Sequence, residues 1–93
     1  MSEMRLMVSV SELEWFKKEF PGIKWEAGDT TIRWNANDPE EVEMARKAYE
    51  AYKKKHPNAL AYKTDRHEKK ADALSAFDPN AEVILMVKQM VGG

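Results

Sequence analysis

The chain has 93 residues, of which 43% are hydrophobic and 33% are charged. This length fits a single domain, 1–93, and the hydrophobic content fits one core, which excludes a disordered chain. The absence of cysteine excludes disulfides and cysteine zinc sites, and the formal net charge of −1 argues against a general binder of polyanions.

Residues 5–10 are rich in Val, Leu and Met and predict the first strand. Ser11 and Glu14 then have the spacing of a capping box, which predicts a helix with Ser11 as its N-cap. Pro21 and Gly22 end this helix. Its large apolar residues recur at helical spacing and predict the buried side: Leu13, Phe16 and Phe20.

Residues 23–27 and 30–34 both alternate between apolar and polar side chains, as strands do. Gly28 and Asp29 separate them, and a two-residue loop that begins with Gly suits a type II′ turn. The pattern therefore predicts a β-hairpin. Its apolar side chains share one face and are predicted to lie in the core: Ile23, Trp25, Ile32 and Trp34.

A second helix is predicted to have Asp38 as its N-cap, with Pro39 at the first helical position and Glu41 at the third. This helix ends before Pro57. Its apolar stripe is predicted to consist of Val42, Ala45, Tyr49 and Tyr52.

Residues 59–64 predict a strand, whereas residues 71–77 fit either a short strand or a helical turn. Residues 82–91 predict the last strand. Because residues 83–87 are apolar without interruption, we expect this strand to be covered on both faces and so to be central in its sheet.

These elements predict an α+β fold with a single, mainly antiparallel sheet and two helices on one face. Two architectures fit the order of the elements. A β-grasp, which has a hairpin, a long helix and a last strand that returns to the centre, is favoured by the long last strand. A ferredoxin-like split βαβ is the alternative.

The last residues, 81–93, read AEVILMVKQMVGG and resemble the end of the ubiquitin-like β-grasp carriers, especially the molybdopterin-synthase small subunit and its thiamine-pathway relative. In those families an apolar last strand leads into Gly-Gly, whose carboxylate is adenylated and then thiolated or conjugated. Gly92 and Gly93 match these positions, so the resemblance implies that they form a carrier tail. The alternative is that the two glycines are only the end of the chain.

No nucleophile elbow, P-loop or dinucleotide motif occurs, and the one local group of acids and bases (Asp65, His67 and Glu68) lies in a hydrophilic connection. We therefore expect a protein that is not an enzyme and that uses no cofactor or metal. The expected function is a small protein-interaction module with a protein partner, for which Trp15 is a candidate contact. Self-association through an edge strand would instead give a homodimer.

The apolar run within residues 1–10 is too short for a signal peptide or a membrane span, so we expect a cytoplasmic protein with no membrane partner.

The alternative function is binding of single-stranded nucleic acid through the basic region 53–70, where Tyr52 and Tyr62 would provide stacking surfaces. The candidate contacts are Lys54, Lys55, Arg66, Lys69 and Lys70. The competing explanation is structural: lysines in the last turn complement the helix dipole, and the remaining charges solvate a loop.

Overall fold

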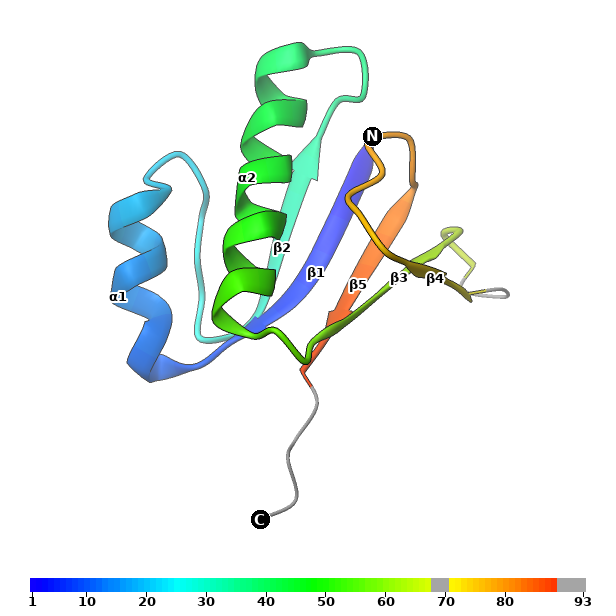
Figure 1. The fold of residues 1–93 in the computed structure, drawn as a ribbon. Coiled ribbons are helices and arrows are strands. Elements are labelled where there is room, and N and C mark those ends of the chain that lie inside the picture. The colour runs from blue at the N-terminus through cyan, green and yellow to red at the C-terminus, as the bar shows by residue number, and fades with distance from the viewer. Residues whose placement is uncertain (68–70, 89–93) are drawn as a thin grey trace.

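The structure, a computed structural model, describes residues 1–67 and 71–88 (Figure 1). This part of the chain folds as a small α+β protein with two helices and one mixed sheet of five strands. The elements in chain order are β1 (Ser2–Val8), α1 (Val10–Glu19), β2 (Gly28–Trp34), α2 (Pro39–Lys55), β3 (Leu60–Thr64), β4 (Ala71–Leu74) and β5 (Val83–Val87).

The strands lie in the order β2-β1-β5-β3-β4. β1 is antiparallel to β2 and parallel to β5, while β3 is antiparallel to both β5 and β4. The sheet is therefore mainly antiparallel with the last strand at its centre, as the sequence predicted. The helix α1 joins two antiparallel neighbours, β1 and β2, so this unit is not a βαβ crossover and does not match the ferredoxin-like alternative.

Both helices contribute to one core on the same side of the sheet. α2 runs across the sheet and α1 lies beside it (Figure 1). The ring of Phe16 in α1 lies 6.2 Å from the ring of Tyr52 in α2 and stacks on Trp25 at 4.6 Å. On the opposite side, which we call the open face, β1 exposes Arg5 and Met7, and neither described helix covers them.

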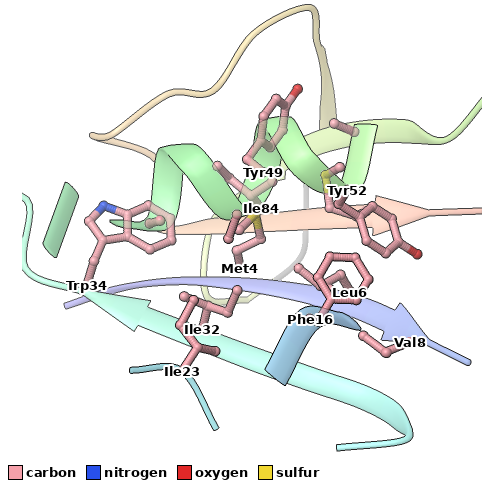
Figure 2. Packing of buried hydrophobic residues seen from close by; sticks show 14 of the residues in the cluster. Met4, Leu6, Val8, Phe16, Ile23, Ile32, Trp34, Tyr49, Tyr52 and Ile84 are labelled. Carbon is pink, nitrogen blue, oxygen red and sulfur yellow. The ribbon is translucent and has the colours of Figure 1, made fainter. Parts of the chain in front are cut away.

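The strands supply the floor of the core through their alternating side chains (Figure 2). In β1, the side chains on the face that the helices cover are at most 2% exposed: Met4, Leu6 and Val8. Ile84 of β5 is fully buried beside them. Trp34 at the end of β2 is also fully buried, and its indole nitrogen donates a hydrogen bond to the carbonyl of Pro79 at 3.0 Å. The polar atom of this tryptophan is thus satisfied inside the fold.

The predicted hairpin is wrong, because residues 23–27 form no strand and β2 pairs with β1 instead. The Thr30 hydroxyl accepts a hydrogen bond from the Glu26 N–H at 3.0 Å and donates one to the Glu26 carbonyl at 2.8 Å, which closes a tight turn around Gly28. Gly28 has a φ of +90°, a conformation that favours glycine. Trp25 donates to the carbonyl of Phe20 and stacks on Phe16, so this residue of the alternating segment packs against α1.

The placement of the apolar side chains of that segment was nevertheless correct. All four residues assigned to the core are at most 8% exposed: Ile23, Trp25, Ile32 and Trp34. An alternating pattern indicates which side chains are buried, and here these side chains are buried although residues 23–27 form no strand.

The start of α1 lies two residues before its predicted place. Ser9 is the N-cap and Glu12 is the third helical residue, whereas the sequence pattern was assigned to Ser11 and Glu14. The Glu12 carboxylate accepts a hydrogen bond from the Ser9 N–H at 3.0 Å. Both registers satisfy the Ser-x-x-Glu spacing, so only the tertiary contacts of Glu12 could decide between them.

The prediction for α2 is confirmed. The Asp38 side chain accepts hydrogen bonds from the N–H groups of Glu40 and Glu41, and Pro39 begins the helix. Of the predicted stripe, Ala45, Tyr49 and Tyr52 are buried and Val42 packs against them.

The structure shows which element residues 71–77 form and corrects the prediction for the last strand. β4 forms within the segment that fitted either a strand or a helical turn. β5 ends at Val87, before its predicted end, and Val87 is 47% exposed, so the strand is not covered on both faces. Its unbroken run of apolar residues places Leu85 and Val87 toward the open face.

Two buried tyrosines of α2 predict a measurable contrast. The Tyr52 hydroxyl donates to the Met7 carbonyl at 2.6 Å, whereas the buried Tyr49 hydroxyl has no hydrogen-bond partner among the described residues. We expect Tyr52→Phe to lower the free energy of unfolding by about 1 kcal/mol, because the Met7 carbonyl loses the hydrogen bond from the Tyr52 hydroxyl. Tyr49→Phe should leave stability unchanged or raise it slightly.

Urea denaturation of both variants and of the unmodified chain measures this difference. Each variant loses one hydroxyl, so Tyr49→Phe serves as the matched control. Equal losses of stability would contradict the assignment of the Tyr52 hydrogen bond.

Candidate functional site

Three exposed apolar side chains lie together on the open face, at the end of the sheet where β5 stops. Leu60 of β3 pairs with Val87 of β5, and the pairing of Arg5 with Leu85 places Met7 of β1 on the other side of Val87. Met7, Val87 and Leu60 are 53%, 47% and 40% exposed, and we call them the apolar row. Contiguous exposed apolar side chains of this kind mark interaction surfaces more often than isolated ones do.

A hollow of about 720 Å³ adjoins the apolar row over β1, β2 and β5. Met7, Leu85 and Val87 form its apolar part, and the stretch after β5 contributes Lys88. Charged residues of both signs border it on β1 and β2: Glu3, Arg5, Asp29 and Arg33. This mixture of an apolar centre and a polar rim is typical of protein interfaces.

At the same end of the sheet, three parts of the chain meet at one buried carboxylate. Glu12 of α1 has a side chain only 8% exposed. Its Oε1 lies 2.7 Å from Nε2 of His56 at the end of α2, and its Oε2 accepts a hydrogen bond from Nζ of Lys88 at 2.9 Å. Ser9 donates to the same Oε2 through its backbone N–H and its hydroxyl. We call Glu12, His56 and Lys88 the Glu12 cluster.

The surroundings of Glu12 keep it ionised. Burial by itself would raise the pKa of this carboxyl, but hydrogen bonds from Ser9, Lys88 and His56 outweigh burial and lower the pKa to about 2. The pKa of the nearby Tyr52 hydroxyl is instead raised, to about 12, by burial and by the negative charge of Glu12. At neutral pH the cluster therefore holds a carboxylate anion next to a neutral phenol.

The structure brings together two of the predicted contact residues. Trp15 is 39% exposed, and Nζ of Lys55 lies 4.3 Å from the centre of its ring, a cation–π contact between α1 and the end of α2. Lys54 is exposed in the same last turn.

The structure separates Arg66 from these lysines. Lys54 and Lys55 precede β3, whereas Arg66 follows it, and the five residues of β3 span about 17 Å. Arg66 donates to the Met1 carbonyl at 3.0 Å and lies 3.8 Å from the Glu82 carboxylate. Arg66 and the two lysines therefore follow and precede β3, respectively.

The remaining predicted residues, Lys69, Lys70, Gly92 and Gly93, lie outside the described residues.

Sequence reasoning missed the apolar row and the Glu12 cluster. The uninterrupted apolar run of β5 was a signal for the row, since alternate side chains of a strand face opposite sides. The Glu12 cluster carried no such signal, because Lys88 is 76 residues from Glu12.

Comparisons of the chain with protein-family models, with curated proteins and with solved structures found no match. Among the described residues, no three His, Asp or Glu side chains are placed to hold a metal ion. Neither helix of the described part of the chain has the length and hydrophobicity needed to cross a membrane.

The lowered pKa of Glu12 predicts how acid affects stability. A carboxyl whose pKa is lower in the folded than in the unfolded chain stabilises the fold above the unfolded value, near 4.5, and loses this effect as the pH falls toward 2. At one pKa unit per 1.4 kcal/mol, the contribution at pH 7 is on the order of 3 kcal/mol.

We therefore expect Glu12→Gln to be much less stable than the unmodified chain at pH 7, and the difference to shrink between pH 4.5 and pH 2. Urea denaturation of both proteins across this range measures it. Glu14→Gln, at an exposed position of the same helix, is the control. A difference that does not vary with pH would contradict the role of the charge.

Proposed function

We propose that the protein is a small, non-catalytic protein-interaction module with a β-grasp fold, and that it acts as a ubiquitin-like carrier through Gly92 and Gly93. The observation that carries this proposal is the position of β5, which is central in the sheet and ends beside the apolar row. The carrier would work in the cytoplasm with a protein partner that supplies the catalysis.

The order of the strands supports the β-grasp assignment. In this fold a hairpin is followed by a long helix and by a last strand that returns beside the first. Here β1 and β2 form the antiparallel pair, α2 is the long helix, and β5 returns parallel to β1. The helix α1 and residues 20–27 then form an insertion between the strands of the pair, which differs from the hairpin that the sequence suggested.

The end of β5 supports the carrier function. The chain leaves the sheet after Val87, a member of the apolar row, and only six residues remain before the terminus. A partner that docks on the apolar row would contact Val87, six residues before Gly93 in the sequence. Two glycines at the terminus suit such a partner, because a chain without side chains can enter a narrow active site.

The hollow on the open face supports a binding rather than a catalytic role. The groups with a strongly shifted pKa, Glu12 and Tyr52, do not line it. Catalytic acids and bases usually combine a shifted pKa with a position in a cleft.

The first test is the intact mass of the protein after incubation with ATP in lysate of its source cells. We expect an ATP-dependent adenylate, thiocarboxylate or conjugate at the C-terminus, and we expect a chain that lacks Gly93 to show none. The shortened chain is otherwise identical and should unfold at the same urea concentration. An unchanged mass of the full chain would rule out the carrier function under these conditions.

A second test addresses the docking surface. Val87→Glu places a charge in the apolar row and should reduce the ATP-dependent modification at least tenfold, because it buries an unpaired charge in the interface. Val10→Glu is the matched control, since Val10 is 77% exposed at the start of α1 and is not a member of the row. Equal modification of the two variants would show that the partner does not use the apolar row.

A further inference from the structure

The contacts of Glu12 exceed what the start of α1 requires. A helix start of this type needs the carboxylate to accept a hydrogen bond from the N-cap N–H, which Glu12 does for Ser9. Glu12 also holds His56 and Lys88, which belong to two other parts of the fold. Because the Glu12 side chain is almost fully buried, its ionic contact with Lys88 is only weakly screened by salt.

The contact with Lys88 is important because Lys88 lies beyond the sheet. The last pair of the ladder between β3 and β5 joins Leu60 to Val87, so Lys88 is the first residue after the strand. Its side chain is 27% exposed, and its Nζ lies 2.9 Å from Oε2 of Glu12. Lys88 also lines the hollow next to Val87.

Glu12 is itself held firmly by the body of the fold. It lies in the first turn of α1, one turn before Phe16, which is fully buried between Trp25 and Tyr52. The ring of Tyr52 lies 4.8 Å from the ring of His56, which contacts the other oxygen of Glu12. A group fixed from two helices can restrain a chain segment that the sheet no longer restrains.

We infer that Glu12 is a positioning residue for the C-terminal stretch: its carboxylate holds Lys88 and so fixes the point from which residues 89–93 continue. The importance of this restraint for modification of the terminus rests on the proposed carrier function. The restraint itself does not depend on that function.

Backbone ¹⁵N relaxation of the full chain tests the inference. Lys88→Met keeps the aliphatic stem and removes the ammonium group, while the start of α1 remains intact. We expect the order parameter of residue 88 to fall from about 0.85, typical of rigid backbone, to below about 0.6. Glu12→Gln should have the same effect on residue 88, and combining the two substitutions should add little to either one.

Lys63→Met is the control, because Lys63 forms a different ion pair, with Asp78 at 3.4 Å, away from the end of β5. It should leave residue 88 unchanged. An unaltered order parameter at residue 88 in Lys88→Met would overturn the inference. So would a loss of order throughout α1 and β5 in that variant, since it would show that the pair only stabilises the fold.

The relaxation measurement needs no activating partner, so it can succeed where the ATP-dependent assay fails. If the terminus is modified in the unmodified chain, Lys88→Met should slow the modification several-fold, and Lys63→Met should not. A normal rate in Lys88→Met, together with a mobile residue 88, would separate the restraint from the carrier function and overturn its role in positioning the terminus.

Discussion

The parallel pairing of β1 with β5 is the constraint on which the rest of the fold depends. It joins the first strand of the chain to the last, with Met4 beside Ile84 and both side chains fully buried. Closing so long a loop costs conformational entropy, although this cost grows only slowly with loop length. The burial of apolar side chains under α2 offsets it, and the pairing leaves β2 on one side and β3 with β4 on the other.

A cluster of aromatic side chains explains how α1 fits between two neighbouring strands without disturbing the sheet. Phe16 stacks on Trp25 and faces Tyr52, so α1, the segment after it and α2 share one contact region. The Tyr52 hydroxyl then reaches the Met7 carbonyl at the end of β1. These contacts bring α1 to the end of the sheet where β5 stops, and they place Glu12 within reach of Lys88. The aromatic contacts that pack the core therefore also determine where the candidate site lies.

The sequence predicted those features that depend on neighbouring residues. Asp38 and Pro39 define the start of α2 because capping acts over one turn of helix. The hairpin prediction was wrong because residues 23–27 do not pair as a strand. Instead Trp25 packs against α1, and this contact cannot be inferred from a local pattern. Of the candidate site, the sequence indicated the apolar run of β5 but not its exposed edge, because exposure depends on which face the helices cover.

By itself the sequence determined the α+β class, the boundaries of α2 and the burial of most of the apolar side chains of residues 23–34 and of α2, because periodicity and capping are local properties. Only the tertiary structure decided the partner of β2, the register of the α1 start and the meeting of Glu12, His56 and Lys88. The physical reason is the same in each case. Local patterns do not specify these arrangements, and contacts between residues far apart in the chain select them.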